Sequence, residues 1–248
     1  MANKKPHNFV QAGSNGKPST EKPQQTTHTL QQAKPVGNAG AYRAAAVILW
    51  IIALIFEIIA LVLVRRTVVY KLQLNLPTLI ILIVLDLICV VIGSQLWKKA
   101  NHIKPASEKN PTLFWLWNNM GVIVALICFV PLIIIVLTDK NMDKKTKTIT
   151  AIVAVIALLL GGMSGIDFNP VSQEQQQAAI EELGDANVFW APYGRVYHTH
   201  EDCGALNNTE TLTYGTVEEA IAAGRTRICS FCANKDAITD LPTEEPME

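Results

Sequence analysis

Four residues near the carboxyl end of the chain have the types and spacing of a metal site. His198 and Cys203 lie close together in the sequence, and Cys229 and Cys232 are separated by two residues. Two cysteines at that spacing form a tight turn on which both thiolates can bind one ion. Three thiolates and one imidazole are the ligand set of a closed, tetrahedral zinc site. We therefore predict a zinc ion with a structural role at these four residues.

The same residues leave three alternatives open. His200 is two residues from His198 on a strand-like run, so both imidazoles share one face and either could be the ligand. Cys229 and Cys232 could form a thioredoxin-like redox pair, but the βαβ pattern that surrounds such pairs is missing. A catalytic zinc with His200 or Glu201 acting on a bound water would need an open coordination position, and four protein ligands leave none.

Short ordered elements are expected to position these ligands. Val188–Trp190 and residues 195–198 are strand-like runs, and residues 191–194 supply a proline and a glycine for the turn between them. Thr216 and Glu219 form a capping box that opens a helix over residues 217–223, and a glycine at 224 closes it. We predict an α+β zinc-binding module over residues 187–238.

This segment resembles the small metal-binding module of Ada-type DNA-repair proteins, which is also found appended to bacterial membrane and secreted proteins. The resemblance covers about fifty residues and rests on Tyr197-His198, Asp202-Cys203, Leu206, Glu218-Glu219-Ala220 with Gly224, and Cys229-Ser230-Phe231-Cys232. It implies the metal and the fold, and the Tyr-His match favours His198 over His200. The repair proteins use four cysteines, one of which accepts a methyl group. Because histidine takes one of those places here, the resemblance does not extend to repair chemistry.

Upstream of the module the chain is strongly apolar. Half of its 248 residues are hydrophobic, and they are concentrated between residues 42 and 166. Four apolar segments, at 42–64, 76–97, 113–137 and 148–166, are each near the roughly 20 residues that cross a hydrocarbon core. We predict an all-α transmembrane bundle of about four helices over residues 42–167. The whole chain then looks like a multi-pass bacterial membrane protein, and the lipid bilayer is an expected partner.

The remaining segments are polar. Residues 1–41 are basic and poor in large apolar side chains, and residues 239–248 are acidic, so both are predicted to be disordered. Residues 168–186 are predicted to form a juxtamembrane helix or linker that begins at Asn169-Pro170 and ends before Gly184. An even number of spans puts both termini on one side. Thiolate ligands persist best in a reducing compartment, so we expect both termini in the cytoplasm of a cell-membrane protein.

Two carboxylic acids interrupt the apolar segments. Glu57 lies in the first and Asp86 in the second, at similar depths from the loop that joins them. Such a pair could bind a cation or relay protons, because a carboxylate inside a bilayer is costly unless it has a partner. The alternative is that both are neutral acids that hydrogen-bond across helices, with Asn118 or Asn119 in a similar role.

Small residues recur in the fourth apolar segment. Ala157, Gly161 and Gly165 are four residues apart, so a neighbouring helix can approach closely along this stripe. The stripe predicts packing within the bundle or between copies of the chain.

The expected function follows from these parts. The loops contain no nucleotide-binding motif, nucleophilic triad or open metal centre, so we expect a non-enzymatic membrane protein. Its zinc module would serve as an interaction or sensing head for a protein partner. The alternative is a small proton- or cation-coupled transporter that uses Glu57 and Asp86. A nucleic-acid partner is disfavoured, because no dense basic cluster surrounds Cys203 and Cys229.

Overall fold

A computed structural model describes residues 7–12, 37–70, 75–140, 142–184, 186–239 and 241–243, with the backbone alone at 66–70. These residues form two compact units. The helical unit comprises Gly40–Ala100 and Trp115–Phe168, and the mixed unit comprises the described parts of Met1–Ala39, Asn101–Phe114 and Asn169–Glu248. Each unit has its own hydrophobic core.

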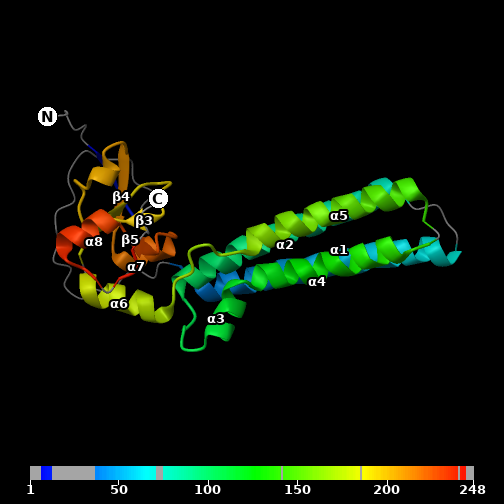
Figure 1. Cartoon of the computed structure of the whole chain (residues 1–248), viewed down its shortest axis with the longest axis horizontal. Coiled ribbons are helices and arrows are strands. Elements are labelled where there is room, and N and C mark those ends of the chain that lie inside the picture. The colour runs from blue at the N-terminus through cyan, green and yellow to red at the C-terminus, as the bar shows by residue number, and fades with distance from the viewer. Residues whose placement is uncertain are drawn as a thin grey trace. The chain divides into compact units, whose positions relative to one another are not determined.

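Among the described residues, four helices are long and apolar enough to cross a bilayer. They run side by side in Figure 1 and are α1 (Ala39–Tyr70), α2 (Leu76–Ile103), α4 (Met120–Thr138) and α5 (Lys144–Gly165). This confirms the prediction of four membrane-length helices and points to membrane association. Three of them run several residues beyond the apolar segments from which they were predicted.

The four helices bury an apolar core and also expose many large apolar side chains. The core contains both small side chains, such as Ala125 and Ala157, and large ones, such as Phe129. Large apolar side chains face outward along every helix, including Ile48, Ile55, Ile58, Ile81, Ile92, Ile134, Ile152 and Leu159. Such a continuous apolar exterior is unfavourable in water and suits a hydrocarbon environment.

The third predicted span, residues 113–137, is divided into two helices. A short helix, α3 (Pro111–Asn118), ends before Asn119, and the membrane-length helix α4 begins at Met120. The Asn119 side chain donates a hydrogen bond to the Trp115 carbonyl at 2.9 Å. A side-chain amide that bonds the backbone in this way competes with the helical hydrogen bonds, which accounts for the break.

The small-residue stripe of α5 packs within the chain. A Cβ atom on Gly165 would lie 2.4 Å from the Val122 nitrogen of α4, and one on Gly161 would contact Phe129 and Ala125. Ala157 is also buried in the helical core. The stripe therefore lets α4 and α5 approach closely, while self-association of the chain stays a prediction.

The mixed unit contains short helices and a small sheet region. Its elements are α6 (Gln173–Leu183), β2 (Val188–Trp190), β3 (Val196–Tyr197), the 3₁₀ helix η1 (Gly204–Leu206), β4 (Thr211–Gly215), α7 (Val217–Ala222), β5 (Arg227–Ile228) and α8 (Ser230–Asp236). β2 pairs antiparallel with β4, and β3 pairs in parallel with β5. β2 and β3 meet only at an isolated bridge between Phe189 and His198, so the predicted hairpin is confined to that one pair.

The N-terminal tail contributes a strand, which the sequence did not predict. β1 (Asn8–Gln11) pairs in parallel with β4, and its Phe9 side chain is buried in the core of the mixed unit. Residues 7–12 are therefore ordered, contrary to the disorder predicted for residues 1–41. Residues 1–6 and 13–36 of that tail lie outside the described residues. The helix α1 begins at Ala39, within the predicted tail.

Part of the C-terminal tail is also ordered. Leu241 is buried in the mixed core, Ile228 donates a backbone hydrogen bond to the Pro242 carbonyl at 3.1 Å, and Thr243 forms a bridge with Ile228. These contacts contradict the predicted disorder at residues 241–243. Residues 240 and 244–248 of the same tail lie outside the described residues.

The loop between α2 and α3 belongs to the mixed unit as well. Gln173 of α6 donates a backbone hydrogen bond to the Ala106 carbonyl at 3.0 Å, and the Glu174 carboxylate accepts from the Ser107 hydroxyl and from the Glu108 amide. The hydrogen bond from Ser107, followed by that from Glu108, lowers the pKa of Glu174. The ionised carboxylate therefore holds this loop against α6.

The caps of two helices decide where they begin. α6 does not begin at Asn169-Pro170 as predicted but at Gln173, because Ser172 and Gln175 form a capping box. α7 begins as predicted, with the Thr216 hydroxyl accepting from the Glu219 amide and the Glu219 carboxylate accepting from the Thr216 amide. Gly224, at φ 85°, follows the end of α7 and turns the chain toward β5.

Candidate functional site

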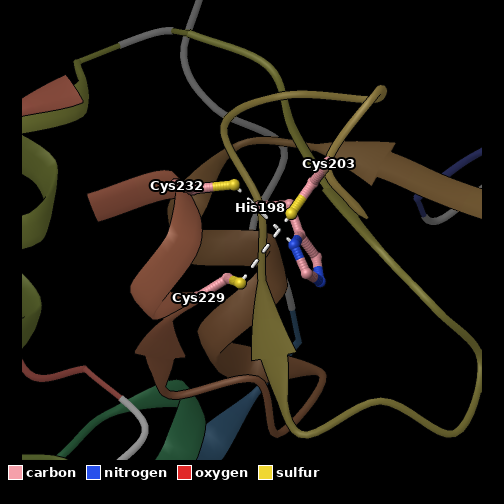
Figure 2. A group of neighbouring side chains, drawn as sticks. All are labelled: His198, Cys203, Cys229 and Cys232. Atoms are coloured by element: carbon pink, nitrogen blue, oxygen red, sulfur yellow. Dashed lines mark hydrogen bonds between the residues drawn. The ribbon is translucent and has the colours of Figure 1, made fainter. Parts of the chain in front are cut away.

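The mixed unit brings His198, Cys203, Cys229 and Cys232 together (Figure 2). His198 follows β3 and is held by two backbone hydrogen bonds of 2.7 Å with Phe189. Cys203 precedes the 3₁₀ helix η1, whose Leu206 amide donates to the Cys203 carbonyl. Backbone contacts rather than flexible loops therefore fix the first two side chains.

The other two side chains come from one turn of the chain. Cys229 follows β5 and donates its backbone N–H to the Tyr197 carbonyl at 2.9 Å, which ties it to the strand that carries His198. Cys232 lies in the first turn of α8, and the Ala233 amide donates to the Cys229 carbonyl. The parallel pairing of β3 with β5 thus sets the spacing between the two halves of the site.

The distances within the group fit a tetrahedral metal ion. The ligand atoms all lie within 4.8 Å of one another. The Cys203 and Cys229 sulfurs are 3.9 Å apart, and the Cys232 sulfur is 3.8 Å from His198 Nδ1. Zinc–sulfur bonds of about 2.3 Å and zinc–nitrogen bonds of about 2.0 Å place tetrahedral ligands about 3.6 to 3.8 Å apart. All three cysteines are free thiols rather than disulfide partners.

Burial controls the protonation of these groups. Burial raises the pKa of Cys203 to about 12 and lowers the pKa of His198 to about 4. Near neutral pH, and with no ion bound, both groups are therefore uncharged. A divalent cation would replace the thiol protons and stabilise the thiolates, which is the chemistry that a buried Cys₃His set supplies.

The alternative ligand, His200, lies apart from this group. Its Nε2 atom is 2.6 Å from Asp236 Oδ1, and the Thr199 hydroxyl donates to the other oxygen of the same carboxylate. His200 is also partly exposed, whereas His198 is buried. The geometry therefore favours His198 as the histidine of the cluster.

The two acids of the apolar segments are both buried in the helical unit. Glu57 of α1 and Asp86 of α2 are 4% and 1% exposed and interact electrostatically with each other. Asp86 also interacts with the Cys128 thiol of α4. Yet Glu57 Oε1 and both carboxyl oxygens of Asp86 have no well-formed hydrogen bond. Buried carboxyl groups with unused acceptor capacity are suited to hold a proton or a cation.

Cys128 was not predicted to belong to this cluster. It lies on a different helix from Asp86, with α3 between them in the sequence, and looks like one more apolar residue of its span. Its position becomes meaningful only once α2 and α4 are packed together. Asn119, one of the two asparagines expected to hydrogen-bond across helices, donates to the Trp115 carbonyl of its own segment instead.

Comparisons with protein-family models, with curated proteins and with solved structures found no match. The likeness of residues 188–237 to the Ada-type module accordingly stays a prediction. What the structure adds to that prediction is a buried group of one imidazole and three thiols at ligand distance.

Proposed function

We propose that this chain is a multi-pass membrane protein whose C-terminal module is folded around one zinc ion and acts as an interaction head. The observation that carries the proposal is the buried cluster of His198, Cys203, Cys229 and Cys232 in a chain with four membrane-length helices. Three thiols and one imidazole suit zinc better than the hard cations, which prefer oxygen ligands. Because four protein ligands complete a tetrahedron, the proposed role of the ion is structural rather than catalytic.

The proposed topology has four spans and both termini on one side. Three distant parts of the chain lie in the mixed unit: the N-terminal strand, the loop between α2 and α3, and the described residues from Asn169 onward. Four membrane crossings place these three segments on the same side, so the grouping supports the topology. Cysteine thiolates persist in reducing compartments, which favours the cytoplasmic side of the cell membrane.

The metal is tested on the full chain, purified in detergent under reducing conditions without added zinc. We expect one zinc per chain, with the thiols of Cys203, Cys229 and Cys232 protected until the ion is chelated. Cys229→Ser combined with Cys232→Ser should abolish zinc binding but leave membrane insertion intact. Cys89→Ser, in α2 and outside the cluster, is the matched control and should retain the zinc. A chain without metal, in which the thiols of the cluster react before any chelator is added, would refute the proposal.

A second candidate function is proton- or cation-coupled transport through the helical unit. It is favoured by the buried acids Glu57 and Asp86, because Glu57 Oε1 and both carboxyl oxygens of Asp86 have no well-formed hydrogen bond. The test is proton and sodium flux into proteoliposomes that contain the full chain. Glu57→Gln and Asp86→Asn should abolish any such flux, and unchanged flux in both variants would remove the basis of this candidate.

A further inference from the structure

A strand from the opposite end of the chain covers the edge of β4. β1 pairs in parallel with β4 from Asn8 opposite Thr211 to Gln11 opposite Tyr214. Two further backbone hydrogen bonds of 2.8 Å extend the pairing, from the Asn8 amide to the Glu210 carbonyl and from the Ala12 amide to the Tyr214 carbonyl. The other edge of β4 pairs with β2. In the absence of β1, β4 would thus be an open edge strand, which is a template for another strand.

One side chain anchors β1 in the mixed unit. Phe9 is 6% exposed, lies in the hydrophobic core and packs edge-on against Phe189, with ring centroids 6.2 Å apart. His7 is also buried, and its Nδ1 atom is 2.7 Å from the Thr209 carbonyl oxygen. The other side chains of residues 7–12 are half-buried or exposed. Backbone pairing with a buried side chain at an alternate position is how proteins bind peptides by strand addition.

The rest of the mixed unit does not depend on β1 for its main contacts. All four candidate ligands lie between residues 198 and 232, and the sheet that spaces them is formed by β3 and β5. β2 pairs with β4 on the edge away from β1, and α7 is capped by its own Thr216 and Glu219. The other elements of the unit therefore contact one another without β1, and β1 adds only the outermost strand of the sheet.

We propose that the edge of β4 is a peptide-binding site and that residues 7–12 are its tethered ligand. The site selects an extended segment of this sequence, with an aromatic side chain at the position of Phe9, aligned parallel to β4. The segment is supplied by the same chain, in which β1 already pairs with β4. The inference rests on the proposed interaction head and specifies what that head binds.

The experiment uses the full chain in detergent with a protease recognition sequence inserted between residues 13 and 36. After folding and cleavage, a fluorescent peptide of residues 5–14 is added in excess, and its anisotropy is followed. We expect saturable binding to the cleaved chain and at least tenfold weaker binding to the uncut chain, whose site is filled. A peptide with Phe9→Ala should bind at least tenfold more weakly than the parent. A peptide with Gln11→Ala, which alters the exposed side chain of β1, is the matched control.

Three binding results would overturn the inference: no exchange into a cleaved chain that keeps its zinc, equal binding by the cut and uncut chains, or equal binding by the Phe9→Ala peptide. Zinc content is measured before and after cleavage. Absence of zinc before cleavage refutes the metal module itself. Loss of zinc only after cleavage shows that β1 is an integral part of the fold rather than a ligand, which also overturns the inference. In light scattering, a dimer of the uncut chain that Phe9→Ala dissociates would show that the strand comes from a second copy, and this result would overturn the inference as well.

Discussion

The contact between α4 and α5 yields a specific prediction, because two glycines of α5 differ in the space around them. Gly165 is tightly packed, whereas Gly162 faces open space. A Cβ atom on Gly165 would lie 2.4 Å from the backbone nitrogen of Val122 and 2.5 Å from the carbonyl carbon of Gly121. A Cβ atom on Gly162 would have no heavy atom within 4 Å. Alanine at the two positions is the same chemical change, yet only one of them should disturb the packing.

The expected magnitudes follow from these distances. Ordinary carbon contacts begin near 3.4 Å, so Gly165→Ala overlaps backbone atoms by about 1 Å, and no rotamer change can relieve it. Overpacking costs about 1 to 3 kcal/mol, and a clash with backbone atoms belongs at the upper end of that range, about 2 to 3 kcal/mol. Alanine regains up to about 1 kcal/mol of helix propensity over glycine. We therefore expect Gly165→Ala to lower the free energy of unfolding by about 1 to 2 kcal/mol, and Gly162→Ala to leave it unchanged or raise it by up to about 1 kcal/mol.

The assay is unfolding of the full chain in mixed micelles by increasing sodium dodecyl sulfate, followed by tryptophan fluorescence. Gly162→Ala serves as the internal control, because it makes the same change on the same helix. Equal stability of the Gly165→Ala and wild-type chains would refute the close approach of α4 and α5. Equal destabilisation by both substitutions would show that the different surroundings of the two positions do not decide the effect, which would also refute the packing argument.

Three further predictions concern the mixed unit. His198→Ala should lower zinc affinity at least about 100-fold, whereas His200→Ala should change it less than about tenfold, as measured by competition with a chromophoric chelator; similar losses would contradict the assignment of His198. Ala237→Gly should raise the stability of the unit by up to about 1 kcal/mol in thermal unfolding, because Ala237 ends α8 at φ 57°, and a lower midpoint would count against this. The lowered pKa of Glu174 means that its hydrogen bonds to residues 104–110 stabilise the fold above the ordinary carboxyl pKa of about 4.3 and are lost as the pH falls through the lowered value. Hydrogen exchange of that loop should therefore differ between the wild type and Glu174→Gln at pH 7 but not in strong acid, and equal exchange at pH 7 would exclude the contact.

Hydropathy and metal-ligand spacing predicted the main parts of the structure. The apolar segments were long enough to identify four helices, and the capping box at Thr216 and the glycine at 224 marked the ends of α7. The four residues of the candidate site were recognisable because ligand type and short spacing carry their own signal. The choice between His198 and His200 depended on Asp236, a residue that only the folded unit brings near.

The failures of prediction have a common physical cause. β1 is a short strand in a polar segment, and its partner β4 lies some 200 residues away, so no local pattern marks it. The order at residues 241–243 likewise depends on Ile228, and the role of Cys128 depends on the packing of α2 with α4. The break at Asn119 could have been anticipated from two consecutive asparagines in an apolar run, since their side chains compete for backbone groups.

The pairing of β1 with β4 also constrains how the protein is made. At about 5 to 20 residues per second, the ribosome synthesises β4 roughly 10 to 40 s after it has synthesised β1. All four membrane-length helices are synthesised in that interval. In the proposed four-span topology, failure of one helix to insert would leave the two strands on opposite faces of the bilayer, and the sheet could not close. Completion of the three-stranded sheet would then be a check on membrane topology that the chain carries within itself.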